Sequence, residues 1–221
     1  MRGPQKPPTY DADISILPDT TFPSDIPVPQ DDGACDHLTG KDFPSLEIPS
    51  TAGNVVDISS LSGVTILFCY PRTAAPDETV PDSWNEIPGA RGCTPQACSF
   101  RDASKEFLEL GVSHIFGAST QDTPYQQEVK QRVGLPYQLL SDESLALQKA
   151  LNLPTFEWQG KKLIKRLSMV IEDAKILKVF YPVFPPSESA NEVLKWMKNY
   201  GGRQNLSTAA EDETMRNLQH R

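Results

Sequence analysis

Positive charge and long hydrophobic runs are both scarce in this chain of 221 residues. The net charge is −8 at pH 7, so the chain has no basic stripe that could neutralise the phosphates of a nucleic acid or bind anionic lipid. No stretch approaches the roughly 20 apolar residues of a membrane-spanning helix, and the first residues (MRGPQKPPTYDAD) lack the apolar core of a signal peptide. The sequence therefore predicts a cytoplasmic protein without a nucleic-acid or membrane partner.

Cysteine is scarce too, and the chain contains only Cys35, Cys69, Cys93 and Cys98. Four cysteines without a secretory signal are too few for a disulfide scaffold, and no second close pair completes a four-ligand zinc site. In a reducing compartment the close pair, Cys93 and Cys98, is expected to be reactive. Cys35 lies among prolines and acids and is expected to be an incidental, exposed cysteine; the alternative is a reductant-facing or intermolecular thiol.

Proline, by contrast, is abundant and unevenly distributed. Nine of the 20 prolines lie within residues 1–50, among acidic and small polar residues, and this composition does not sustain helices or strand pairing. We therefore expect residues 1–40 to form an extended, proline-rich arm. At the other end a Gly-Gly stop signal followed by little apolar material predicts a flexible tail over 201–221. Residues 41–200 remain as one globular domain.

Between these ends, predicted strands and helices alternate, which is typical of an α/β domain. Continuous apolar runs predict buried strands at 64–70, 113–120 and 137–142. Apolar residues at helical spacing predict helices at 95–110, 123–134, 143–152 and 187–200. Two runs separated by a short polar turn predict an antiparallel hairpin at 166–173 and 175–183.

Cys93 and Cys98 are five residues apart where the helix at 95–110 is expected to begin. In an intact helix, five residues correspond to an axial rise of about 7.5 Å. This rise already exceeds the Cα separation of about 7 Å that a disulfide tolerates. The pair therefore consists either of two separate thiols or of a site that alternates between a wound reduced form and an unwound oxidised form.

Cys93 is the better candidate for a reactive sulfur. It lies just before Thr94 and Pro95, at the expected helix start, where unpaired N–H groups and the helix dipole favour a thiolate below the ordinary pKa of about 8.5. Arg91 and Arg101 flank it in sequence, and either could add positive potential. Cys69, within the apolar run at 64–70, is the better candidate for a buried and inert cysteine.

Several separated motifs resemble one known family. The stretch GCTPQACSFRD (92–102), preceded by a strand ending in Tyr-Pro and followed by LPYQLLSDE and RLSMVIED, resembles the peroxiredoxins of the bacterioferritin-comigratory type, also called peroxiredoxin Q. The similarity extends over about residues 42–200. It implies a thioredoxin-like α/β fold with a central mixed β-sheet flanked by helices.

The resemblance also implies an activity and a set of site residues. It implies a thiol peroxidase for hydrogen peroxide or organic hydroperoxides, with Cys93 as peroxidatic nucleophile and Cys98 as the resolving thiol that forms an intramolecular disulfide. Arg166 is implied to hold the thiolate and the peroxide oxygens. Thioredoxin or a similar dithiol protein would reduce the disulfide. No metal, haem or flavin is implied, and the chain is expected to be a monomer or weak homodimer.

Two departures from the family pattern leave alternatives open. Ala90 occupies the position of a threonine whose hydroxyl helps to orient cysteine and peroxide, and Thr73 could supply a hydroxyl only if the intervening residues loop out. These residues, an insertion at 72–90, could cover the pocket and set substrate preference, or could be a surface excursion without function. The alternative function is a redox-responsive or specialised-metabolism protein on the same fold with weak peroxidase activity.

Overall fold

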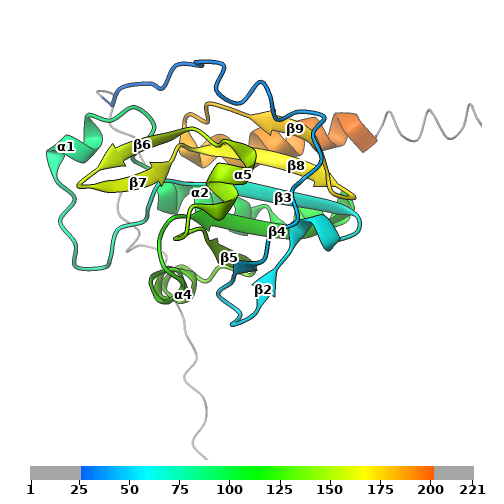
Figure 1. Cartoon of the computed structure of the whole chain (residues 1–221), viewed down its shortest axis with the longest axis horizontal. Helices are drawn as coiled ribbons and strands as arrows, with labels where there is room; N and C mark the ends of the chain where they lie inside the picture. Colours follow the sequence, from blue (N-terminus) through cyan, green and yellow to red (C-terminus); the bar gives the residue numbers. More distant parts are fainter. Residues whose placement is uncertain (1–25, 202–221) are drawn as a thin grey trace, which may run out of the picture.

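A computed structural model describes residues 26–201, and its centre is a five-stranded sheet with the strand order β5-β4-β3-β8-β9 (Figure 1). The strands are β3 (Val64–Cys69), β4 (Val112–Ser119), β5 (Gln138–Ser141), β8 (Leu167–Glu172) and β9 (Lys175–Phe180). β3, β4 and β5 run parallel, whereas β8 is antiparallel to both β3 and β9. The expected α/β fold with a central mixed sheet is thereby confirmed.

The central strand β3 is buried on both faces because its residues alternate between two hydrophobic cores. Leu67 and Cys69 belong to the first core, and Ile66 and Phe68 belong to the second. All of β3 is buried, as its continuous apolar run predicts. On the neighbouring β4, a Cβ at Gly117 would lie 2.6 Å from the Phe68 ring, so glycine is required for the two strands to pack this closely.

The second core is covered by α2 (Cys93–Asp102), α3 (Ser104–Glu109), α4 (Thr123–Arg132) and a helix at 189–201 that follows the 3-10 turn η3 (Pro186–Glu188). The sequence predicts one helix at 95–110, but the chain breaks it at Ala103. There the Ser104 hydroxyl donates to the Arg101 carbonyl at 2.7 Å and competes with the helical pattern. None of the helices within residues 26–201 has the length and apolarity needed to cross a bilayer.

The first core is covered by α5 (Ala146–Leu151) and by the segment at 26–61, which contains β1 (Ile48–Pro49), β2 (Val55–Val56) and the 3-10 turn η2 (Ile58–Ser60). In Figure 1 this segment, coloured blue to cyan, passes β9 and crosses toward β5. Leu38 is fully buried, and the Gly40 N–H donates to the Ile176 carbonyl of β9 at 2.8 Å. Residues 26–40 lack helices and strands, as expected for an extended arm, but they pack onto the domain.

The buried arm changes the interpretation of Cys35. Its exposed fraction is 5 %, so the prediction of an exposed cysteine is wrong. Burial, aided by the charges of Asp32, Asp31 and Asp36, raises the pKa of its thiol to about 12. Such a thiol is poorly suited to redox exchange at neutral pH. The rest of the predicted arm and the predicted tail at 202–221 lie outside the described residues.

A hairpin of β6 (Thr155–Trp158) and β7 (Lys161–Ile164) lies beside α1 (Asp82–Asn85), as Figure 1 shows. The sequence patterns described above do not predict this hairpin. Its signal is the Gln159-Gly160 pair, whose φ angles of 49° and 72° form the tight turn between the strands. The hairpin matters for the site because it supports the insertion at 72–90.

Candidate active site

Cys93 is the first residue of α2, as the sequence predicts. Gly92 before it has a φ of 102°, a left-handed conformation that glycine adopts without strain, and this turns the chain into the helix. The first N–H groups of a helix lack intrahelical acceptors, and the helix dipole adds to their partial positive charge. The Cys93 sulfur therefore lies where the backbone favours an anion.

The guanidinium of Arg166, between β7 and β8, contacts this sulfur. Arg166 Nη2 lies 3.2 Å from Cys93 Sγ, although 73 residues separate the two in sequence. Their exposed fractions are 3 % and 4 %, so water and salt screen little of the attraction between a thiolate and the guanidinium. The structure thus brings together Cys93 and Arg166, two of the three residues that are expected to form the site.

The arginines that flank the cysteine in sequence are engaged elsewhere. Arg91 donates to the side chain of Asn85 at 3.3 Å, and Arg101 donates to the Val133 carbonyl at 2.7 Å. The positive charge beside the sulfur therefore comes from Arg166, across the fold, and not from a neighbour in sequence.

Arg166 is held in place by backbone and side-chain acceptors. Its Nη2 donates to the carbonyl oxygens of residues 89–91 at 3.1–3.3 Å, and its Nη1 donates to the side-chain oxygen of Gln96. Gln96 is fully buried and donates to the Ser189 hydroxyl at 3.3 Å, which lies 3.0 Å from the Ser168 hydroxyl. Sequence reasoning missed Gln96, although it lies one helical turn after the cysteine, on the same face of α2.

Burial alone does not separate Cys93 from an inert cysteine. The sequence assigns burial to Cys69 rather than Cys93, but both are buried. Burial, with the charge of Asp142 added, raises the pKa of Cys69 far above its ordinary range. Cys93 differs because a guanidinium contacts its sulfur. With 4 % of its surface exposed, Cys93 presents only a small part of its surface to a peroxide.

Cys98 lies further along α2 and is partly exposed. Burial raises the pKa of its thiol, and the charge of Arg101 opposes this shift. Helix α2 is wound from Cys93 to Asp102, and both cysteines are free thiols. The structure therefore describes the wound, reduced form, and a disulfide between the two requires the first turns of α2 to unwind.

Neither Ala90 nor Thr73 presents a hydroxyl to the sulfur. Ala90 is fully buried in a third core with Trp84 and Leu163, and its carbonyl oxygen accepts from the Cys93 thiol at 3.6 Å. The Thr73 hydroxyl donates instead to the side-chain oxygen of Gln121 at 3.2 Å. At position 90 the group that contacts the sulfur is therefore a backbone carbonyl and not a side-chain hydroxyl.

The insertion at 72–90 is a folded part of the domain. Trp84 of α1 is 4 % exposed and packs edge-on against Trp158 of β6, with 4.9 Å between the ring centroids. The guanidinium of Arg72 lies 5.0 Å from the Trp158 ring centroid and 5.6 Å from that of Trp84. The insertion is therefore packed onto the domain through its buried tryptophan.

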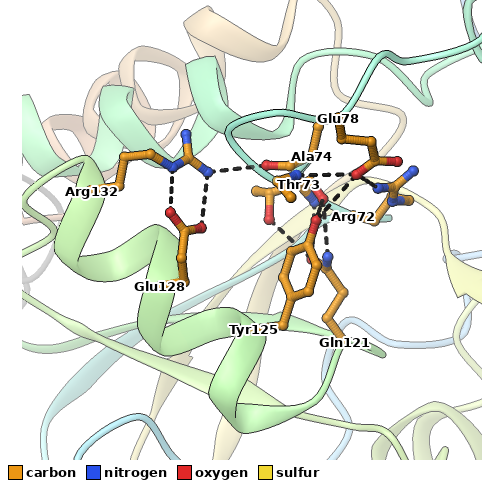
Figure 2. A network of polar contacts seen from close by, with 9 residues as sticks. Arg72, Thr73, Ala74, Glu78, Gln121, Tyr125, Glu128 and Arg132 are labelled. Atoms are coloured by element: carbon orange, nitrogen blue, oxygen red, sulfur yellow. Dashed lines mark hydrogen bonds and ion pairs between the residues drawn. The ribbon is translucent and has the colours of Figure 1, made fainter.

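Polar contacts attach the first part of the insertion to α4, as Figure 2 shows. The Thr73 carbonyl accepts from the Tyr125 hydroxyl and from the Gln121 amide, each at 3.0 Å. Nearer the end of α4, Arg132 donates to the Ala74 carbonyl at 3.0 Å. Because residues 89–91 at the other end hold Arg166, the insertion links α4 and the β6–β7 hairpin to the reactive sulfur.

Replacing Trp84 with alanine tests this support. The free energy of unfolding is expected to fall by about 3–5 kcal/mol, because a large buried ring leaves a cavity in the third core. Trp84→Phe keeps an aromatic ring there and should cost clearly less. Chemical denaturation measures both values. A loss below about 1 kcal/mol in Trp84→Ala would show that the insertion is only loosely attached.

A cysteine at a helix N-terminus, in contact with a buried arginine and followed by a second cysteine on the same helix, is an arrangement typical of reactive cysteines. Residues 38–194 match the family model described as Redoxin. The chain belongs to this family, and within it to the peroxiredoxins of the Q and Bcp type, with their thioredoxin-like fold.

Relatives and solved structures agree with this assignment. Peroxiredoxin Bcp of Bacillus subtilis is 30 % identical over 62 % of this chain and 76 % of its own length. Chloroplastic peroxiredoxin Q of Suaeda salsa is 27 % identical over 71 % of this chain, and the match spans just under two thirds (65 %) of that protein. The crystal structure of peroxidoxin BcpB from Mycobacterium tuberculosis, 28 % identical, has a TM-score of 0.60 and covers 73 % of this chain and 97 % of its own.

Proposed function

We propose that the chain is a thiol peroxidase that reduces hydrogen peroxide or organic hydroperoxides, with Cys93 as the nucleophile. The contact of 3.2 Å between Arg166 Nη2 and Cys93 Sγ carries this proposal. A guanidinium beside the sulfur favours the thiolate, which is the nucleophilic form. Its planar set of donors also suits the oxygen atoms of a peroxide and the charge that develops on the leaving oxygen.

The proposed reaction cycle has three steps. The Cys93 thiolate attacks the terminal peroxide oxygen, so that an S–O bond forms, the O–O bond breaks, and the leaving oxygen takes a proton to become water or an alcohol. The Cys98 thiol then condenses with the sulfenic acid, which forms the disulfide and releases water. A dithiol protein of the thioredoxin type, oxidised in turn, restores both thiols by exchange. These steps require no metal, haem or flavin.

The assembly and location of the enzyme belong to the same proposal. A monomer or weak homodimer in the cytoplasm fits a site whose two cysteines lie on one helix of one chain. The second step needs no partner subunit, because the resolving thiol is supplied by α2 itself once its first turns unwind.

Mass measurements test the roles of both cysteines. One equivalent of hydrogen peroxide should remove two hydrogens from the reduced chain, and peptide mapping should place the new bond between Cys93 and Cys98. In Cys98→Ser the sulfenic acid is expected to form without being resolved, so the mass should increase by one oxygen. Trapping with dimedone identifies the sulfenic acid at Cys93.

Cys35→Ser provides the matched control. Because Cys35 is buried and its pKa is about 12, this variant should lose two hydrogens as the unmodified chain does. An intramolecular disulfide with the unmodified mass pattern in Cys98→Ser would contradict the resolving role. Unchanged mass in the unmodified chain would contradict the peroxidase itself.

One observation favours the alternative, a redox-responsive protein with weak peroxidase activity. Arg166 Nη2 has two hydrogens but faces four acceptors, namely the carbonyl oxygens of residues 89–91 and Cys93 Sγ. A peroxide must displace some of these contacts before it binds. Stopped-flow oxidation separates the functions: a rate near that of a free thiol supports the alternative, and a rate orders of magnitude higher supports the peroxidase.

A further inference from the structure

A second cavity lies apart from the one beside Arg166. The cavity beside Arg166, which Gly89 and Phe156 also line, belongs to the active site. The second cavity has a volume of about 450 Å³, and neither Arg166 nor Cys93 lines it. Its volume falls within the range of about 300–1,000 Å³ that is typical of small-molecule sites. The peroxidase chemistry proposed above makes no use of this second cavity.

Four parts of the chain form the walls of the second cavity. They are the start of the insertion, the loop between β4 and α4, the loop between β5 and α5, and the β6–β7 hairpin. The two loops follow the carboxyl ends of the parallel strands β4 and β5, the edge at which open α/β sheets bind ligands. Figure 2 shows that the first two walls are joined, because Gln121 and Tyr125 both donate to the Thr73 carbonyl at 3.0 Å.

Opposite charges line the second cavity without pairing across it. Lys161 and Lys162 lie on β7, whereas Asp122 and Glu143 lie in the two loops. None of the four forms an ion pair within residues 26–201. The positive and the negative groups thus balance in number but lie on different walls. A ligand that carries both charges, one at each end, can neutralise both walls at once.

The remaining charges of the cavity already compensate each other. Arg72 is ion-paired with Glu78, whose carboxylate also accepts from the Tyr125 hydroxyl at 3.3 Å, as Figure 2 shows. The Arg72 guanidinium lies 5.0 Å from the ring centroid of Trp158. Trp158 is paired with Lys161 in the register of the hairpin, so the two side chains lie on the same face. Lys161, and not Arg72, is therefore the cation that is open to a carboxylate of the ligand.

A strained residue shapes the wall after β5. Leu145 lines the cavity and has a φ of 60°, a left-handed conformation that is rare for a bulky side chain. Buried Asp142 holds this turn, because its carbonyl accepts from the Leu145 N–H at 2.9 Å and its carboxylate accepts from the N–H groups of Leu147 and Gln148 at 2.8 and 2.9 Å. Backbone strain of this kind is concentrated at ligand-binding sites. The conformation of Leu145 thus supports the assignment of this cavity to a ligand.

We propose that the second cavity binds a small zwitterion, a di- or tripeptide with a free ammonium group and a free carboxylate. The ammonium group lies beside Asp122 and Glu143, and the carboxylate lies beside Lys161 and Lys162. Thr120 also lines the cavity, and its hydroxyl can donate to or accept from the peptide groups between the two ends. This site is independent of the proposed peroxidase function.

Triglycine and its two blocked forms test the proposal on the full chain. Triglycine should perturb the amide NMR signals of Thr120, Leu145 and Gln159 with a Kd on the order of 1 mM. N-acetyl-triglycine lacks the ammonium group and triglycine amide lacks the carboxylate, so each should bind about three- to tenfold more weakly. Added salt should weaken the binding of triglycine as well. Equal affinities for the three peptides, or signals that triglycine leaves unperturbed, would overturn the proposal.

Substitutions of exposed side chains assign each end of the ligand. Lys161→Gln should weaken the binding of triglycine but not that of triglycine amide, which has no carboxylate to lose. Glu143→Gln should weaken the binding of triglycine but not that of N-acetyl-triglycine, which has no ammonium group. Lys195→Gln, at an exposed lysine of the last helix, is the matched control and should bind all three peptides as the unmodified chain does. Equal weakening of all three peptides by Lys161→Gln would overturn the assignment. These measurements monitor binding and need no peroxidase activity.

Discussion

Replacing Arg166 with alanine is expected to slow the oxidation of Cys93 by peroxide about 100- to 1,000-fold. This is the usual cost of removing a preorganised donor that stabilises a developing negative charge. Two effects contribute here. The thiolate loses the guanidinium 3.2 Å from its sulfur, and the leaving oxygen loses a charged donor. Stopped-flow kinetics under single-turnover conditions measures the rate directly.

Two further readouts distinguish this role from mere structural support. Without the guanidinium, alkylation of Cys93 by iodoacetamide should become slower, because the sulfur loses the charged donor that contacts it. Arg166→Lys keeps a positive charge but not the planar set of donors, so its rate should lie between those of the unmodified chain and Arg166→Ala. An unchanged alkylation rate in a folded Arg166→Ala protein would contradict the assignment.

The insertion explains why the arginine is so strongly held. Carbonyl groups at and just after its end accept from Arg166 Nη2, and its tryptophan, Trp84, belongs to the third core and packs against Trp158 of the β6–β7 hairpin. Residues 89–91 therefore help to fix the position of the guanidinium, and their own position depends on packing some distance from the sulfur. This arrangement couples the position of Arg166 to the stability of the insertion, and Trp84→Ala should consequently change the oxidation rate as well as the unfolding free energy.

The elements that sequence patterns predicted are those with strong local signals. The apolar run of β3 and the helix start beside Cys93 are visible without knowledge of the fold. Arg166 is predicted only by the resemblance to the family. No local sequence pattern indicates a contact between two residues that are 73 positions apart, such as Arg166 and Cys93. The burial of Cys35 was missed for the same reason: local composition is rich in proline and acids, and only packing against the sheet reveals that Leu38 anchors the segment.

Local sequence patterns also do not predict the β6–β7 hairpin or the cavity beside Arg166. Each strand of the β6–β7 hairpin has only four residues, too short for periodicity to stand out against the surrounding polar residues. The cavity beside Arg166 combines residues from the arm, the insertion, β6 and the segment after β9. Such a site exists only in three dimensions, because it is assembled from segments far apart in the chain.

Replacing Cys93 with serine is expected to have the largest effect of all, lowering the rate of peroxide reduction about 1,000-fold or more. A serine hydroxyl fits the same position, where it can accept from Arg166 and donate to the Ala90 carbonyl, so the fold should be kept. A hydroxyl is not ionised there at neutral pH and does not attack the peroxide. The remaining thiols cannot compensate, because burial raises the pKa of Cys35, Cys69 and Cys98.

Cys98→Ser is the matched control, since it makes the same substitution on the same helix. It should retain rapid oxidation by the first equivalent of peroxide and lose only the turnover supported by a dithiol reductant. The contrast separates the nucleophile from the resolving thiol in a way that neither variant achieves alone. Rapid oxidation in Cys93→Ser, with the oxygen mapped to Cys98, would reverse the two roles and move the reactive centre from the buried start of α2 to its partly exposed middle.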